Sequence, residues 1–318
     1  MSDELFELLA PLLAPTLQHL LAPINLSPLS RLPPSRLLAT ARPHIHTIEL
    51  VSPSAFATDY APLYTSLFHG GERERPDLIV ERLQQDAEEK RTALSPYRVV
   101  GLRGERGKVL GAAQFSVLLL DLAHDAEEVR AVPYLQYIYI HPSHRRQDLS
   151  ELLHTLVLAV SMASSPNPSK AKVPFTLFET EPPTHGDDAP ARKTALERTS
   201  IHTRSGSMAL MLCKPPILPD GPPVYISAHV QPGLEPEDPP LTLIWVIRPN
   251  PAHHEETIDF NKLGPLVLAA VYRSFRDEAF PEANIALAEE ITGKRRAGAD
   301  FCLMELAEVR RGMYVGID

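Results

Sequence analysis

A short basic stretch between an apolar run and an amphipathic helix is the part of the sequence whose residue types suggest chemistry. Residues 134–141 are typical of a strand, and apolar residues at helical spacing predict a helix over 149–163. His144, Arg145 and Arg146 lie between them. The first turn of a helix attracts anions and arginine matches phosphate oxygens, so this order is how phosphate-binding turns are built.

The same helix start has a second interpretation. Asp148 and Glu151 have the spacing of a capping box, in which Asp148 accepts the N–H of Glu151 and Glu151 reaches back. The helix would then satisfy its own donors, and the aspartate charge would oppose a phosphate. The nearby histidine and arginines fit either a phosphate site or a solvated surface loop, so the sequence leaves both interpretations open.

Acidic and aromatic side chains on two neighbouring predicted strands are further candidates. Glu179 and Glu181 close the strand predicted over 173–181, and a period of two places them on the same side. Carboxylates there can act as a base or attract a cationic amine, or can be solvated strand-end residues. Tyr137 and Tyr139 face together and fit either a pocket wall or ordinary packing.

Other kinds of site are not supported. His141 and His144 have no third ligand at a usable spacing, so we expect no metal site. No Walker loop, dinucleotide fingerprint, HExxH motif or nucleophile elbow is present. Cys213 and Cys302 are far apart in the sequence and form no disulfide framework, which favours a reducing cytoplasm.

Composition limits the partners. The chain has 318 residues, 44% of them hydrophobic, and a net charge of −9, which favours a globular fold and disfavours nucleic acid and anionic membranes. The start, Met-Ser-Asp-Glu, is acidic, so we expect no export signal. No uninterrupted apolar run reaches the roughly 18 residues of a membrane span.

The elements that must position these residues are separated by prolines. The chain holds 32 prolines against 15 glycines. Residues 4–22 contain the unit Leu-Leu-Ala-Pro three times, and we expect this proline-broken segment to pack on the main domain. Alternation and helical periodicity predict one domain with a mixed, largely antiparallel sheet and one parallel crossover. The predicted strands are 44–51, 97–103, 109–120, 134–141, 173–181, 207–213 and 241–249, and the helices lie within 59–92, at 149–163, near 190–204 and in the C-terminal region.

The order of elements over roughly residues 44–213, with the strand at 241–249 as the last of the sheet, resembles the GNAT superfamily of acyl-CoA-dependent N-acetyltransferases. The family's fourth strand ends in a hydrophobic-x-hydrophobic-His-Pro run, which the residues from Ile138 to Pro142 match. Its loop then reads Gln/Arg-x-x-Gly-x-Gly/Ala. Here Arg145 matches the first position, Ser150 is small at the last, and Asp148 replaces the central glycine.

The resemblance implies a mixed α/β, GNAT-like fold over 44–250, with a proline-rich N-terminal extension (1–43) and a helical C-terminal addition (251–318) packed on it. It also implies acetyl-CoA as co-substrate, held by the backbone of the strand and by the loop. The implied cofactor-binding residues are Ile138, Tyr139, Ile140, Arg145, Arg146, Gln147 and Ser150.

The resemblance further implies transfer of an acetyl or related acyl group from acyl-CoA to an amine of a small molecule or protein. Glu179 is then the preferred base, and His202, at the family's tyrosine position, the preferred acid. The alternative is a GNAT-fold protein without catalysis that acts as a binding or interaction module, as the replaced glycine and the apolar segment 4–22 suggest. Under the first hypothesis, Asp148→Gly should strengthen CoA binding. An assembly of identical chains is left open.

Overall fold

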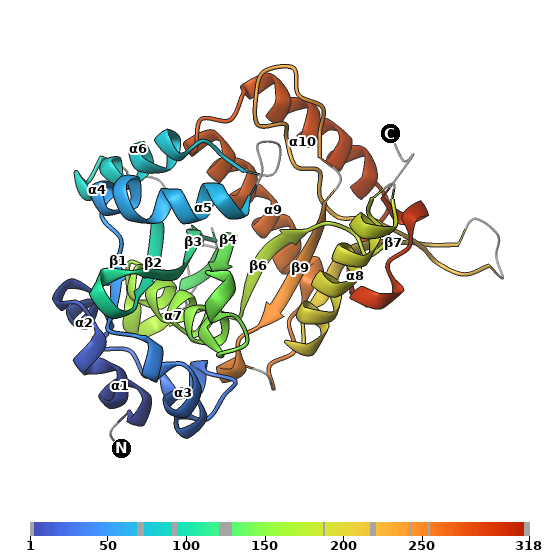
Figure 1. Cartoon of the computed structure of the whole chain (residues 1–318). Coiled ribbons are helices and arrows are strands. Elements are labelled where there is room, and N and C mark those ends of the chain that lie inside the picture. The colour runs from blue at the N-terminus through green and yellow to red at the C-terminus, as the bar shows by residue number, and fades with distance from the viewer. Residues whose placement is uncertain are drawn as a thin grey trace. The chain divides into compact units, whose positions relative to one another are not determined.

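The computed structural model is a mixed α/β structure of two compact units (Figure 1). The first unit is Met1–Pro174 with Asn250–His254, and the second is Phe175–Pro249 with Glu255–Asp318. The structure describes residues 3–68, 73–90, 95–120, 129–186, 188–216, 221–241, 243–253 and 255–314.

The sheet of the first unit is an antiparallel run in chain order. It consists of β1 (Thr47–Leu50), β2 (Tyr97–Arg103), β3 (Val109–Leu119) and β4 (Val129–Ile140), and the short β5 (Ala171–Lys172) runs parallel to the start of β4. Gln114 pairs with Tyr137 while Phe115 pairs with Leu135, so Gln136 forms a bulge in β4. A bulge redirects the strand beyond it, which here is the stretch that leads into the basic loop.

The helices of this unit follow from apolar stripes and from prolines at their first turns. They are α1 (Glu4–Leu9), α2 (Pro15–Leu21), α3 (Pro34–Thr40), α4 (Pro53–Ala55), α5 (Ala61–Leu67), α6 (Pro76–Ala87) and α7 (Leu149–Ala163). Proline fits the start of a helix, where its missing N–H would have no partner, and α2 and α3 each begin with one. Helix α7 follows β4 directly and buries leucines and valines along its length.

The N-terminal segment packs on the sheet of its unit, as expected. Helix α2 contacts both β1 and α7 (Figure 1). The N–H of Ala14 donates to the carbonyl of Ile48 over 2.8 Å, and Leu17 and Leu21 are completely buried. The apolar repeats of this segment therefore form part of a core.

The strands of the second unit pair antiparallel to one another. The strands lie in the order β6 (Phe175–Thr180), β9 (Ile244–Pro249), β7 (Met208–Lys214), β10 (Asp300–Glu305), and β8 (Val224–Ser227) also pairs with β7. Its helices are α8 (Ala189–Arg204), α9 (Phe260–Asp277) and α10 (Glu282–Arg296). The predicted division at residues 43 and 250 does not coincide with these units, because residues 255–318 belong to the same unit as β6.

The C-terminal region differs from the helical addition expected from the sequence. Its last described strand, β10, pairs with β7 from Asp300 to Glu305. Phe301 and Met304 are buried, whereas their neighbours are partly or fully exposed. Six residues with irregular alternation carry a weak strand signal, and pairing with β7 supplies what local propensity lacks.

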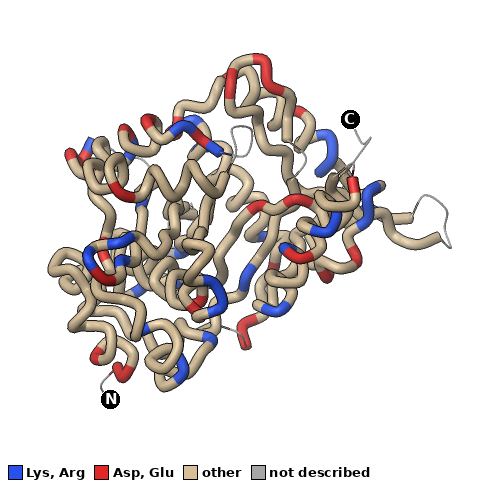
Figure 2. The backbone as a smooth tube through the Cα atoms, in the orientation of Figure 1, with Lys and Arg blue, Asp and Glu red and all other residues tan. Residues whose placement is uncertain are grey.

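Figure 2 shows Lys and Arg interspersed with Asp and Glu along the tube in each unit. Among the helices formed by the described residues, none combines the length and the apolar character that a membrane span needs.

Replacing Leu17 with alanine tests whether the N-terminal segment belongs to the core. We expect Leu17→Ala to lower the free energy of unfolding by about 2–5 kcal/mol, because it removes a fully buried side chain. Leu20→Ala, in the same helix but only partly buried, should cost less than half of that. Guanidinium unfolding measures both, and equal small losses would contradict the packing described above.

Candidate functional site

The loop between β4 and α7 begins with a tight turn at Pro142–His144. The N–H of Ser143 donates to Nδ1 of His141 over 3.3 Å. The Ser143 hydroxyl lies 2.8 Å from that nitrogen and 2.9 Å from Nδ1 of His144. These local bonds fix the first half of the loop and engage both histidines, His141 and His144.

The second half of the loop contains two residues in the left-handed region. Arg146 has φ 63° and Asp148 has φ 55°. Glycine enters this region without steric cost, whereas among other residues Asp and Asn tolerate it best. Asp148 stands where the resembled family has its glycine, and it keeps the backbone conformation for which glycine is suited.

The predicted capping box is wrong. The Asp148 carboxylate makes no capping hydrogen bond, and the N–H of Glu151 donates instead to the Asp148 carbonyl oxygen over 3.1 Å. A capping residue ordinarily has an extended backbone, which the left-handed conformation of Asp148 excludes. Its carboxylate accepts from Arg36 Nε over 2.9 Å and from the Thr40 hydroxyl over 3.0 Å, both on α3.

The helix start is consequently available. The N–H groups of Leu149 and Ser150 donate to no acceptor among the residues that the structure describes. Arg145 and Arg146 are exposed beside them, without an ion pair in the described part of the chain. Gln147 lies between, with its side-chain oxygen buried and unpartnered among described residues. Free donors, a helix dipole and two cationic side chains make a site that suits a phosphate group.

The backbone groups of β4 next to this loop point alternately to the two edges of the strand. The N–H of His141 donates to the Leu110 carbonyl over 2.7 Å, and bonds to one neighbour recur at every second residue of an antiparallel strand. Tyr139 therefore faces β3, while the backbone groups of Ile138 and Ile140 face the other edge. Within the described residues of this unit, β5 pairs only with the first two residues of β4. Of the three residues predicted to contact acetyl-CoA through the backbone, Ile138 and Ile140 direct their backbone groups away from β3 and Tyr139 directs its own toward β3.

Tyr137 and Tyr139 face together, as predicted, but they fill a core. Both rings pack against Tyr64 and Phe68 at centroid distances of 5.0–6.0 Å. The Tyr139 hydroxyl accepts from Gln114 over 3.2 Å, and burial raises the pKa of Tyr139. Tyr139 is 4% exposed, so its side chain is packing material rather than a pocket wall.

Glu179, the predicted base, lies in the second unit with its side chain 9% exposed. Its Oε1 is 2.6 Å from Nε2 of His229 and accepts from the indole N–H of Trp245 over 3.2 Å. The His229 ring stacks on Trp245 at 4.5 Å, and its side chain is completely buried. Sequence reasoning missed His229, because 50 residues separate it from Glu179 and no motif links the two.

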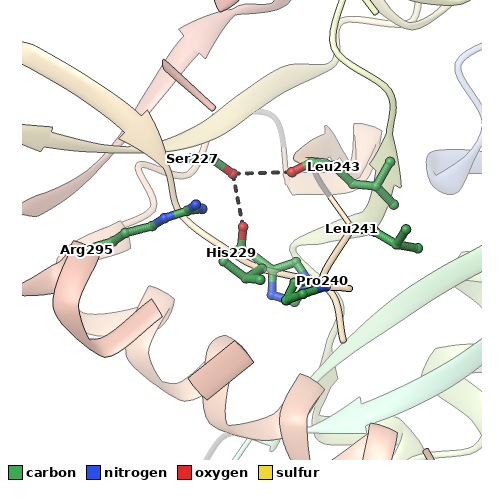
Figure 3. Close-up of a pocket in the computed structure, with 7 residues that line it drawn as sticks. Ser227, His229, Pro240, Leu241, Leu243 and Arg295 are labelled. Atoms are coloured by element: carbon green, nitrogen blue, oxygen red, sulfur yellow. Dashed lines mark hydrogen bonds between the residues drawn. The ribbon is translucent and has the colours of Figure 1, made fainter. Parts of the chain in front are cut away.

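A small cavity lies beside His229 (Figure 3). The Ser227 hydroxyl donates to the carbonyls of His229 and Leu243 over 3.1 and 3.3 Å, and Arg295 contributes its side chain to the lining. A volume of about 20 Å³ holds about one water molecule. The cavity has no room for an amine substrate.

His202, the predicted acid, packs on the other face of the same sheet. Its ring lies 4.7 Å from Phe178, and burial, with smaller contributions from Arg198 and Arg248, lowers the pKa of His202 to about 4. Its ring is therefore neutral near pH 7, which suits a proton acceptor better than the predicted proton donor. Glu181 accepts from Arg198 of α8 over 2.6 Å, whereas Glu179 lies against His229 and Trp245. The two glutamates therefore have different surroundings.

The structure does not bring the two predicted catalytic residues together. Phe178 and Glu179 are consecutive in β6, and consecutive strand residues point to opposite faces. The Phe178 side contacts His202 on α8, and the Glu179 side contacts His229, which lies against Phe275 of α9. Glu179 and His202 thus cannot act on one reacting atom in this arrangement.

Solved structures that are similar to this chain include two proteins of related description. A protein described as an acyl-CoA N-acyltransferase from Klebsiella pneumoniae subsp. pneumoniae MGH 78578 is similar with a TM-score of 0.28 and 16% identity, over 64% of this chain and 97% of that one. A region of a fungal multi-domain β-N-acetylglucosaminidase, described as a GCN5-related glucosamine N-acetyltransferase region, has a TM-score of 0.24 and 14% identity, over 41% of this chain and 15% of that one. No family model and no curated protein matches. Likenesses this distant do not define a function.

The lowered pKa of His202 makes stability depend on pH. Between the ordinary value of 6.5 and about 4, the unfolded state binds more protons, so this contribution is complete above pH 6.5 and is lost as pH falls toward 4. We expect His202→Gln to flatten the loss of unfolding free energy between pH 7 and pH 4.5. His19→Gln, at an exposed position in α2, is the control. Parallel curves for wild type and His202→Gln, measured by urea unfolding at each pH, would show that burial does not act on this ring.

Proposed function

We propose that this protein is an N-acyltransferase that transfers an acetyl or related acyl group from acyl-CoA to an amine of a small molecule or protein. The observation that carries the proposal is Asp148. It has the backbone of the loop glycine that it replaces, and its carboxylate is turned to Arg36 instead of the helix start. The departure from the resembled loop thus leaves the backbone donors in place.

The loop residues offer a pyrophosphate two kinds of contact, backbone N–H donors and cationic side chains. The N–H groups of Leu149 and Ser150 are directed backbone donors at the positive end of α7. Arg145 and Arg146 are long, exposed cations that can close on phosphate oxygens from the solvent side. Gln147 places its amide in the same turn. All of these groups belong to the first unit, so that unit alone supplies the proposed pyrophosphate site.

The edge of β4 is the proposed place of the thioester. Bound acyl-CoA supplies an activated acyl group whose carbonyl gains negative charge as the amine attacks. Backbone N–H groups of Ile138 and Ile140 point away from β3 and can donate to that oxygen. The Tyr139 ring, between these two residues in the strand, packs in the aromatic core and fixes this part of β4.

Of the two predicted catalytic residues, His202 is the better candidate. A neutral imidazole can accept a proton from the amine nitrogen as that nitrogen bonds to the acyl carbon and the C–S bond to CoA breaks, whereas the acid role would need a charged ring. Glu179 is engaged by His229 and Trp245, so we propose it as a positioning group for His229 rather than as the base.

A second candidate function is binding without transfer. The hydrogen bond from Trp245 and the close contact with His229 favour this alternative, because they already engage the carboxylate that the sequence suggests as the base. The protein would then bind acyl-CoA or a protein partner without acyl transfer. The two functions separate cleanly once binding and turnover are both measured.

Cofactor binding is tested by removing one backbone donor. Ser150→Pro deletes an N–H at the second position of α7, where proline is tolerated in α8 of this same chain at Pro190. We expect isothermal titration with acetyl-CoA to show about tenfold weaker binding for Ser150→Pro, the worth of one charge-assisted hydrogen bond. Ser150→Ala, which removes only the hydroxyl, should stay within about threefold of wild type. Equal affinities for all three proteins, with α7 intact by circular dichroism, would remove the helix start from the site.

Transfer is tested by mass spectrometry of an amine panel incubated with acetyl-CoA and protein. For an accepted amine, His202→Gln should lower the rate of product formation by at least about a hundredfold, the usual contribution of a general base. The Kd of His202→Gln for acetyl-CoA should equal that of wild type, because His202 lies outside the loop between β4 and α7. Tight binding without product from any amine would favour the second function, and unchanged turnover would exclude His202 from the mechanism.

A further inference from the structure

Helix α3 of the N-terminal segment contacts the loop between β4 and α7 through the carboxylate of Asp148. Arg36 Nε donates to Oδ2 of Asp148 over 2.9 Å, and a second guanidinium nitrogen donates to Oδ1 over 3.4 Å. The Thr40 hydroxyl, one turn further along α3, donates to Oδ2 over 3.0 Å. Both oxygens of the carboxylate are thus occupied by one face of a helix that is 112 residues away in the chain.

Helix α3 is well placed to act as a support. Leu37 lies on a different face of α3 from Arg36 and Thr40, and it is 3% exposed. The helix contacts α1 of the same segment. The Arg36 guanidinium therefore reaches Asp148 from a helix that is itself packed in place. The hydrogen bond to Asp148 raises the pKa of Arg36.

The contact between Arg36 and Asp148 changes the charge that an anionic ligand meets at the start of α7. Asp148 precedes the first residue of α7, where an unpaired carboxylate would repel a phosphate that approaches the same N–H groups. Its side chain is 20% exposed, so solvent screens that charge only in part. Arg36 neutralises the carboxylate and, with Thr40, holds it on the side of α3.

We propose that Arg36 is a positioning residue that sets the affinity of the loop for acyl-CoA by holding and neutralising Asp148. This inference rests on the proposed function. It changes the expectation drawn from the sequence, in which Asp148 weakens the site and Asp148→Gly strengthens it. Here Asp148 is a tether as well as a charge, so its removal also frees the loop from α3.

The test compares four proteins by titration with acetyl-CoA in low salt. Arg36→Met leaves the Asp148 charge unpaired and should weaken binding about fivefold, within the range of exposed ion pairs. Asp148→Asn keeps the left-handed backbone and leaves the arginine charge free, so it should bind at least as tightly as wild type. The double variant has the net charge of wild type and should return to within about twofold of wild-type affinity. At 0.5 M salt the differences should shrink, because exposed charges are screened.

A matched control and three outcomes decide the inference. Arg42→Met removes an exposed arginine from the same N-terminal segment and should leave affinity within about twofold of wild type. Equal binding by wild type and Arg36→Met overturns the inference alone. A double variant as weak as Arg36→Met also overturns it, because loss of the arginine would then act through the fold of the segment rather than through the unpaired charge. Wild type that gives no heat with acetyl-CoA up to millimolar concentration overturns the proposed function together with this inference.

Discussion

The direction of one carboxylate controls what the start of α7 can do. An aspartate immediately before a helix ordinarily accepts a backbone N–H of the first turn and uses up a donor. Asp148 has a left-handed backbone, which turns its side chain to Arg36 and Thr40 on α3. This direction of the side chain leaves the N–H groups of Leu149 and Ser150 free and keeps the Asp148 charge paired with Arg36. The short proline-started helix α3 thereby connects the N-terminal segment to the proposed function.

In the second unit, the same sheet that gives stability also separates the titratable groups. Glu179 lies close to His229 on one face, and His202 is covered by Phe178 on the other. Burial stabilises the neutral form of an imidazole, so His202 is a candidate proton acceptor. A buried carboxylate must be paired, and His229 and Trp245 meet that requirement for Glu179. The chemistry of each group is therefore decided by what covers it.

Local pattern predicted much of the fold. Strand β2 and helix α7 have the predicted bounds, because alternation over 97–103 and an apolar stripe over 149–163 are strong signals. Strand β10 was not predicted, because it depends on pairing with β7. The two strands that contain the candidate residues, β4 and β6, were found from their β-prone composition, and their ends moved by only a few residues except at the start of β4.

For the site, the sequence by itself determined the residue types, the strand–loop–helix order and the presence of an aspartate at the glycine position. It also determined that Glu179 and His202 are near the ends of elements where a reaction could be placed. Only the tertiary structure decided that Asp148 contacts Arg36 instead of capping α7, that His229 pairs with Glu179, and that Glu179 and His202 lie on opposite faces. Sequence patterns report periodicity over neighbouring residues, whereas these contacts join residues 50 to 112 positions apart, and only packing of distant elements brings them together.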